Sequence, residues 1–452
     1  MFSRKSLAQI VCSIVLLSVL VLSACTPATT VPTAVPSEGT TGQAGGDVTL
    51  VVWGESSTIA SLEADPEGTG KGAYLKTLVD MFEKDHPGVK VKLEQHGWDE
   101  ELRQNLTNAM LAGTIPDVIV GEGFFKNYAQ LDALVPIDIT DIQDNLVMGV
   151  LQGATYNGKV YGLSAFTSIF GFERNCEVIT KAGLDCENPP KTWDDLLAQA
   201  EAVNKAGNPD YYGYSLQGPA GFSMGAAFRN YVFTLQNGAA MSKADPSGMD
   251  YPFFNDPKAV PVYEFLRKLN AQTPPGLTFE ADESKLYSQL FAGKSAYQVA
   301  GGWHVSWAKE SGCVDCRYSD IPLPAGGKPA SVVVANVMYG VLKQSKNKDL
   351  AVEFVKYMVK DEVQANVFMA SGRLPTTKSA LTAFRPSADP ATQAYIDILL
   401  NSSNLYAMPQ WPKNTQKVWT SYGDFLTKLY TTDEPVQGLL DEMQKTAEEA
   451  MK

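Results

Sequence analysis

Three short apolar runs separated by two amphipathic patterns constrain the fold of this chain more than any other feature. The first, Val48–Trp53, is a near-continuous apolar run with the β-branched content of a strand buried on both faces. The second strand, Val89–Leu93, alternates valine with lysine, and the third is Val118–Val120. Apolar residues at helical spacing fill the intervals over Tyr74–Lys84 and Trp98–Leu111, whereas Gly54–Gly70 has the polar composition of a loop. This order predicts an α/β fold in which helices wrap a parallel sheet, because crossovers between parallel strands are right-handed.

The polar residues that follow two of these strands form the first candidate site. In a parallel α/β sheet, ligands bind beyond the carboxyl ends of the strands. The first strand ends at Trp53 and is followed by Glu55, and the third strand is followed by Glu122. One indole and two carboxylates are therefore expected at one edge of the predicted sheet.

A second candidate site lies in the stretch GKSAYQVAGGWHVSW, which begins at Gly293. Gly293 follows an amphipathic run and fits the left-handed residue that ends a helix, and a short strand comes next. The glycine pair lets backbone approach a neighbour closely, and Trp303 directly after it offers a flat face with one N–H. We interpret Trp303 as a pocket wall and Trp307 as a core residue, while the role of His304 stays open.

The first residues have the organisation of an exported lipoprotein precursor. Arg4 and Lys5 precede an apolar segment shorter than the roughly 20 residues that a membrane-spanning helix needs. The sequence Leu-Ser-Ala-Cys, which ends at Cys25, resembles the lipobox of bacterial lipoproteins, in which the cysteine is lipidated and becomes the new N-terminus. We therefore expect a cleaved signal peptide over 1–24 and a flexible, lipid-anchored tether over 25–46 at the outer face of the cell membrane.

Charge and cysteine content narrow the classes of partner and site. The chain has 37 basic and 50 acidic residues and a net charge of −13, so nucleic acid and anionic lipid surfaces are not expected partners. Four cysteines follow the export segment, and they can pair in three ways. We favour the local pairs Cys176–Cys186 and Cys313–Cys316; the alternative is a zinc site to which His304 adds a ligand.

A series of motifs occurs in a specific order along the chain after the tether. They are IPDVIV, NGKVYGLSAFTSIFGFERN, KAGL followed by PPKTWDDLLAQA, LFAGKSAYQVAGGW, and SKNKDLAVEFVKYMVKDEVQANVFMASGRLPTTKSAL. In this order they resemble the family 1 extracellular solute-binding proteins, the sugar-binding lipoproteins of bacterial ABC importers to which the maltose-binding protein is related. The resemblance covers nearly the whole chain after the tether, and one departure is Gly302, where the family has proline.

The resemblance implies a periplasmic-binding-protein-like fold with two lobes, each a mainly parallel sheet flanked by helices. It assigns 47–161 and 326–371 to an N-terminal lobe, and 162–325 and 372–452 to a C-terminal lobe. The lobes would close on a captured ligand by hinge motion, and the permease subunits of an ABC transporter would receive the closed form. We expect a monomer with no cofactor, no metal ion and no catalytic activity.

The chemistry of sugars indicates which side chains such a site needs. Their C–H faces stack on aromatic rings, and carboxylates and guanidinium groups pair with neighbouring hydroxyl groups. Every buried hydroxyl needs a partner, because an unmet one costs about 1–3 kcal/mol. The candidates are three aromatic plates, three charged residues, two hydroxyl partners and one further aromatic residue: Trp53, Trp303 and Trp411; Glu55, Glu122 and Arg373; Thr167 and Ser168; and Tyr406.

Two alternatives remain open at this stage. A secreted glycoside hydrolase would also carry tryptophans and a carboxylate pair, for which Glu55 and Glu122 are the candidates. The sequence contains neither an HExxH motif nor a P-loop, and its export segment and tether favour capture and delivery over catalysis. The other alternative keeps the fold but binds a peptide, a polyamine or an oxyanion.

Overall fold

The computed structural model describes most of the chain after the predicted tether. The described residues are 48–54, 56–64, 67, 72–97, 99–219, 223–280, 282–369, 373–401 and 405–452. The predicted signal peptide, the predicted lipidation site Cys25 and the tether lie outside these ranges, and so does Glu55. All described residues belong to one structural unit, Gly46–Lys452.

The N-terminal half of this unit is built on three parallel strands, as the apolar runs predict. Their order is β2-β1-β3, with β1 at Val48–Trp53, β2 at Val89–Glu94 and β3 at Val118–Gly121. The two predicted helices are present as α2 (Ala73–Asp85) and α3 (Asp99–Ala112). This part of the strand–helix order is therefore confirmed.

The predicted polar loop after β1 is wrong over part of its length. Helix α1 occupies Ser56–Ala64 in this interval. Ile59 is buried in the adjoining core, and Leu62 packs against the same core three residues later. An apolar stripe of two residues within a polar segment is too short to be recognised as a helical pattern before the core that covers it is known.

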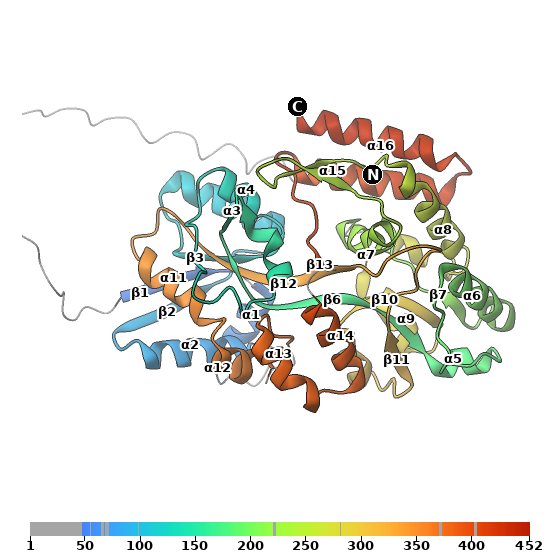
Figure 1. Cartoon of the computed structure of the whole chain (residues 1–452), viewed down its shortest axis with the longest axis horizontal. Helices are drawn as coiled ribbons and strands as arrows, with labels where there is room; N and C mark the ends of the chain where they lie inside the picture. The colour runs from blue at the N-terminus through green and yellow to red at the C-terminus, as the bar shows by residue number, and fades with distance from the viewer. Residues whose placement is uncertain are drawn as a thin grey trace, which may run out of the picture. The chain divides into compact units, whose positions relative to one another are not determined.

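Two long strands run through the middle of the sheet and join its two halves (Figure 1). Strand β6 spans Leu163–Asn175, and strand β12 spans Ser331–Val341. They pair with each other in antiparallel orientation, and the complete strand order is β2-β1-β3-β12-β6-β10-β7. Every residue of β6 is buried, although six of its thirteen residues are polar or charged, because neighbouring strands flank it on both sides.

The C-terminal half extends the sheet on the other side of β6. Strand β10 (Ser295–Gly301) pairs with β6, and β7 (Tyr212–Tyr214) lies parallel to β10 at the edge. Two short strands complete the sheet, because β11 (Cys316–Ser319) pairs with β6 and β13 (Leu405–Tyr406) pairs with β12. The expected parallel pairing is thus present at both outer ends, and the pairs around β6 are antiparallel.

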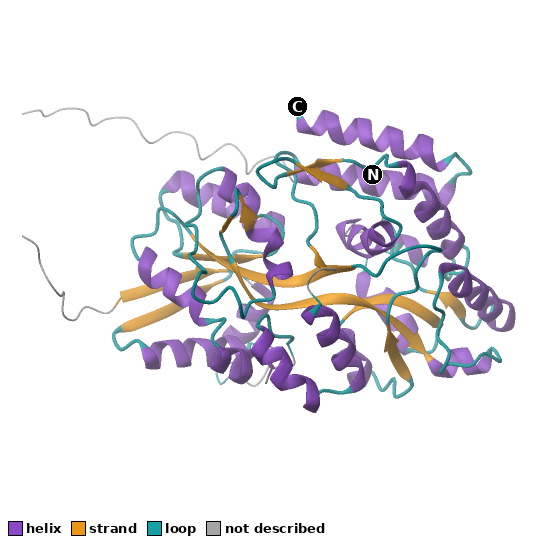
Figure 2. Cartoon of the chain, viewed as in Figure 1, coloured by secondary structure: helices purple, strands orange, loops and turns teal. Residues whose placement is uncertain are grey.

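Helices lie on both sides of the strands (Figure 2). Helix α6 (Trp193–Gly207) begins with a complete capping box between Thr192 and Asp195. The other long helices are α7 (Ser223–Gln236), α8 (Val260–Asn270), α9 (Glu283–Phe291), α11 (Lys348–Tyr357), α14 (Pro390–Leu400), α15 (Thr415–Thr431) and α16 (Val436–Met451). Within the described ranges, no helix combines the length and apolar character needed to cross a membrane.

Short elements connect these helices and strands. The helical ones are α4 (Phe125–Gln130), η1 (Met148–Ala154), α5 (Cys176–Lys181), η2 (Pro257–Ala259), η3 (Leu277–Phe279), α10 (His304–Glu310), α12 (Asp361–Val363), η4 (Gln364–Phe368), α13 (Lys378–Phe384) and η6 (Arg385–Ser387). Two hairpins are formed by β4 (Thr155–Tyr156) with β5 (Lys159–Val160) and by β8 (Ser242–Ala244) with β9 (Asp250–Pro252).

Two large apolar cores correspond to the two halves of the sheet. The N-terminal core contains Phe82 and Phe354, and the C-terminal core contains Trp193 and Tyr422. Helices α13 and α14 contribute to the N-terminal core, although the sequence prediction places residues 372–452 in the C-terminal lobe. The α/β class and the two-lobed fold are confirmed, while the exact lobe boundaries stay a prediction.

Candidate functional site

The strand register brings the carboxyl ends of strands from both halves to the middle of β6. Strand β3 ends at Gly121, which pairs with Met338 of β12, and Met338 pairs in turn with Ser164 of β6. Strand β10 arrives from the other half and ends at Gly301, which pairs with Phe170. The two ends are therefore about 20 Å apart along β6, at the position where α/β sheets bind ligands.

The glycine pair after β10 lets two side chains lie directly against the backbone, the Trp303 indole and the Ser168 hydroxyl. A β-carbon on Gly301 would lie 2.0 Å from a ring carbon of Trp303, so the indole covers the glycine backbone. A β-carbon on Gly302 would lie 2.9 Å from the hydroxyl of Ser168, and the Gly302 amide donates a 2.9 Å hydrogen bond to that hydroxyl. Trp303 is half-buried and meets Phe170 edge to face, with 6.3 Å between ring centroids.

Three further candidates lie at the same part of β6. The Thr167 amide donates a 3.2 Å hydrogen bond to the carbonyl of Leu374, the residue after Arg373. The Arg373 guanidinium stacks 3.8 Å from the ring centroid of Tyr74 and 4.9 Å from that of Phe166. The structure thus places Thr167, Ser168, Trp303 and Arg373 along the same stretch of β6, each through a separate contact. The hydroxyls of Thr167 and Ser168 are buried and bond within the protein, to strand carbonyls and to Gly302.

Glu122 faces the bulge in β12. Its Oε1 accepts a 3.1 Å hydrogen bond from the amide of Asn336, and the Asn336 side chain donates to the carbonyl of Val150 at 2.7 Å. Ala335 has a positive φ of 47°, which marks the irregular backbone that this carboxylate supports. Glu122 is half-buried and lies at the predicted edge of the sheet.

Trp53 reaches the same edge but packs largely inside the protein. It is 7% exposed, its Nε1 donates to Glu94 Oε2 at 2.7 Å, and its ring stacks on His96 with centroids 3.6 Å apart. Burial raises the pKa of Glu94, but hydrogen bonds from Lys92, Trp53 and His96 outweigh this effect and hold that pKa below its usual value. One face and the single donor of Trp53 are therefore already engaged.

The late aromatic segment contains one buried and one exposed candidate. Trp411 is fully buried, with ring centroids 5.4 Å from Trp419 and 5.6 Å from Phe254. Among the described residues, its Nε1 has no hydrogen-bond partner. Tyr406 in β13 is 37% exposed. Trp411 offers no face to a ligand in this structure, because neighbouring aromatic residues enclose it, and it is left out of the site proposed below.

Sequence reasoning missed a buried arginine beside Phe170. Arg229 of α7 donates to Gln217 and to the hydroxyl of Tyr287, and its Nε donates to the carbonyl of Val299 at 3.3 Å. Its guanidinium carbon lies 5.2 Å from the Phe170 ring centroid. An arginine within the apolar run AAFRNYVF was the available signal, since arginine is rarely buried without a partner.

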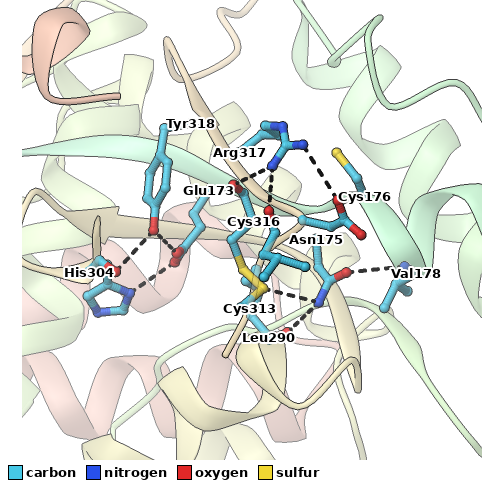
Figure 3. The surroundings of a disulfide bond; sticks show 12 residues. Glu173, Asn175, Cys176, Val178, Leu290, His304, Cys313, Cys316, Arg317 and Tyr318 are labelled. Carbon is cyan, nitrogen blue, oxygen red and sulfur yellow. Dashed lines mark hydrogen bonds and ion pairs between the residues drawn. A yellow bond between two sulfur atoms is a disulfide. The ribbon is translucent and has the colours of Figure 1, made fainter. Parts of the chain in front are cut away.

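The cysteines pair locally, as the spacing favours. Disulfides join Cys176 to Cys186 and Cys313 to Cys316, and Figure 3 shows the second beside β6. His304 is fully buried, and its Nδ1 lies 2.9 Å from Glu173 Oε2. In the part of the chain that the structure describes, no group of three or more His, Cys, Asp or Glu side chains is arranged to hold a metal ion.

Trp307 differs from the sequence expectation. It is 40% exposed, so it is not the core residue that its spacing suggested. Its ring lies 6.4 Å from that of Trp303, so the two indoles share one face of the chain segment that forms α10.

Known proteins resemble this chain in sequence and in structure. A binding protein of Brucella abortus (strain 2308) is 25% identical over 346 residues, which are 74% of this chain and 77% of that protein. The sn-glycerol-3-phosphate-binding periplasmic protein UgpB of Yersinia pestis bv. Antiqua (strain Antiqua) is 26% identical over 286 residues, 60% of this chain and 62% of UgpB. The cyclic α-maltosyl-1,6-maltose binding protein of Arthrobacter globiformis superimposes with a TM-score of 0.72 at 19% identity, covering 90% of this chain and all of that one.

A family model extends this evidence over most of the described unit. The model for the bacterial extracellular solute-binding proteins matches residues 77–395. This range contains the crossing strands β6 and β12, the Gly301–Trp303 turn and Arg373. The chain belongs to the bacterial extracellular solute-binding protein family, and it is an extracytoplasmic solute-binding protein.

Proposed function

We propose that this protein is the substrate-binding lipoprotein of a bacterial ABC importer and that it captures a mono- or oligosaccharide. The observation that carries the proposal is the meeting of both halves at Ser164–Phe170 of β6. Along this stretch the half-buried Trp303 indole contacts Phe170, and the Arg373 guanidinium lies over Phe166. The Glu122 carboxylate accepts from the Asn336 amide in the bulge of β12, the strand next to β6. An aromatic plate with charged hydrogen-bonding groups around it matches the two kinds of surface that a sugar presents.

Several features of the chain support this assignment. The protein of Arthrobacter globiformis that shares the fold is a saccharide-binding protein by name. Strands β6 and β12 cross between the halves, which suits two lobes that close on a ligand by hinge motion. We place the hinge between an N-terminal lobe of 47–161 and 326–371 and a C-terminal lobe of 162–325 and 372–452, with α13 and α14 packed at the junction.

Delivery requires a membrane location and a transporter. The lipobox-like sequence at Cys25 and the tether that follows it would hold the protein at the outer face of the cell membrane. The closed, ligand-loaded monomer would then present both lobes to the permease subunits. Labelling of the expressed protein with a radioactive fatty acid, compared between wild type and Cys25→Ser, tests the anchor; equal labelling would contradict it.

A thermal-shift screen of Thr26–Lys452 tests the ligand class. Mono-, di- and trisaccharides are compared with peptides, polyamines and sn-glycerol 3-phosphate at equal concentration. A ligand at a hundredfold excess over its dissociation constant stabilises the native state by about 2.7 kcal/mol, which gives a clear rise in melting temperature. A rise with one group of sugars supports the proposal, and a rise with the controls alone contradicts it.

The Trp303→Ala variant tests the site within the same screen. We expect it to abolish the sugar-dependent shift while leaving the melting temperature without ligand nearly unchanged, because the indole is only half-buried. Loss of the fold together with binding would show that Trp303 is a core residue. Recovery of the sugar intact after incubation distinguishes capture from hydrolysis by a carboxylate pair.

The UgpB resemblance favours one specific second candidate, a phosphorylated polyol. UgpB is named for sn-glycerol 3-phosphate. Arg373 would then pair with the phosphate through its guanidinium, which suits a tetrahedral oxyanion as well as a diol. A shift with sn-glycerol 3-phosphate and none with any sugar would select this candidate over the saccharide.

A further inference from the structure

Both chain neighbours of Trp303 are tied to the crossing strand β6. On one side, the Gly302 amide donates to the Ser168 hydroxyl at 2.9 Å. On the other side, His304 Nδ1 lies 2.9 Å from the carboxylate of Glu173. The peptide that carries the Trp303 indole is therefore held between two attachment points on a single strand.

Glu173 is the centre of the second attachment. Its carboxylate is fully buried and is met by three donors: Gln298 Nε2 at 2.6 Å, the Tyr318 hydroxyl at 2.6 Å and His304 Nδ1 at 2.9 Å. The Tyr318 hydroxyl also lies 3.0 Å from the carbonyl of His304. Figure 3 shows the three side chains Glu173, His304 and Tyr318 pointing toward one another. Residue 304 is thus held through its ring, and its carbonyl oxygen shares the Tyr318 hydroxyl with Glu173.

The other end of α10 is joined by a disulfide to β11, which pairs with the same strand. The helix ends near Gly312, and the Cys313 amide donates to the Ala308 carbonyl at 2.8 Å. Cys313 is bonded to Cys316, which lies in β11 opposite Asn175 of β6. The Asn175 side-chain amide also lies 3.7 Å from the Cys313 sulfur.

We propose that the buried Glu173–His304–Tyr318 network and the Cys313–Cys316 disulfide are positioning elements that hold α10 on β6 and so fix the Trp303 indole for ligand binding. The proposal rests on the proposed function in one respect, that Trp303 contacts the ligand. A buried carboxylate with three donors is not needed for stability alone, because an apolar group of the same shape often serves as well. It does fix one orientation of each donor, which a ligand-contact residue requires.

A fluorine NMR experiment tests the positioning without any ligand. The seven tryptophans are replaced by 5-fluorotryptophan, and Trp303→Phe assigns the resonance of Trp303. The matched pair of variants is Cys313→Ser/Cys316→Ser and Cys176→Ser/Cys186→Ser, since both remove one disulfide near the end of β6. We expect the Trp303 resonance to shift or broaden in the first variant and to stay unchanged in the second.

A pair of substitutions at His304 tests the network in the same way. Asparagine keeps an N–H near the position of Nδ1, whereas leucine removes the donor and leaves the Glu173 carboxylate one partner short. His304→Leu should move the Trp303 resonance, and His304→Asn should move it less. An unchanged Trp303 resonance in both His304→Leu and Cys313→Ser/Cys316→Ser would overturn the proposal, whatever the ligand is.

The affinity arm uses maltotriose as the probe at a temperature well below the melting point of every variant. We expect the dissociation constant to rise at least about tenfold in His304→Leu and Cys313→Ser/Cys316→Ser, and to change little in Cys176→Ser/Cys186→Ser. Equal affinities with lowered melting temperatures would mean that these groups serve stability only. If neither maltotriose nor any other sugar of the thermal-shift screen binds the wild type, the saccharide assignment fails, while the fluorine resonances still decide the positioning claim.

Discussion

The Gly301→Ala substitution should act almost entirely through Trp303. Gly301 does not have a positive φ, so alanine adds no backbone strain at this position. The new methyl group would lie 2.0, 2.2 and 2.5 Å from three ring carbons of Trp303, and the indole must leave its place. Forcing extra volume into a packed site costs about 1–3 kcal/mol, and we expect a loss of stability in this range.

A double-mutant cycle isolates this effect. In a Trp303→Ala background the clash is absent, so adding Gly301→Ala should cost nothing or stabilise by about 0.4–1 kcal/mol through the less flexible unfolded chain. Urea unfolding of the four proteins gives the coupling free energy, expected at about 1–3 kcal/mol. Gly302→Ala is the control, because its methyl group would meet Ser168 instead and its cost should persist in both backgrounds.

Additive losses of stability from the Gly301→Ala and Trp303→Ala substitutions would refute this reasoning. If Gly301→Ala lowers stability by the same amount with and without the indole, then the ring does not lie over the glycine. The ligand assay gives a second check, since Gly301→Ala should weaken saccharide binding about as much as Trp303→Ala does. Full affinity in Gly301→Ala would separate the position of the indole from ligand binding.

Three further predictions concern the surroundings of the site. The pKa of Glu94 is lowered in the folded state, so its contribution to the free energy of unfolding is present above about pH 4.5 and is lost as the pH falls through the folded-state pKa. Glu94→Gln should therefore flatten the acid side of a stability profile measured by urea unfolding as a function of pH. Parallel acid sides in the wild type and the variant would contradict this. Lys126→Met leaves the buried Asp250 carboxylate, 3.1 Å away, without its cation and should lower the free energy of unfolding in urea by about 3 kcal/mol. Adding Asp250→Asn to the same protein should restore part of this loss. Arg373→Lys removes a planar guanidinium that stacks on two aromatic rings. The substitution should lower the free energy of unfolding by about 0.5–1 kcal/mol and weaken saccharide binding measured by calorimetry. Unchanged values of both quantities would exclude the stack.

Local features of the fold are readable from the sequence because local chemistry determines them. The capping box at Thr192 and Asp195 forms as its spacing predicts. Gly293 has a φ of 68° just after α9, which is the left-handed conformation expected of a helix-ending glycine. The parallel order β2-β1-β3 follows from the alternation of apolar runs and amphipathic helices.

Long-range features of the candidate site are not readable in this way. Burial of Trp411 depends on Phe254 and Trp419, and the first of these is more than 150 residues away in the chain, so no local pattern separates a core indole from an exposed one. Arg229 reaches the site only because β10 brings Val299 and Phe170 to it. Residue type predicted the chemistry, whereas pairing across the sheet determined which side chains meet.

A crystal structure of Thr26–Lys452 with the saccharide that raises its melting temperature most tests the central claim most directly. We predict density for a sugar ring against the Trp303 indole, beside Phe166–Phe170 of β6 and within hydrogen-bond distance of Arg373 or Glu122. A sugar bound elsewhere on the protein, with Trp303 free of contact, would contradict the proposed site.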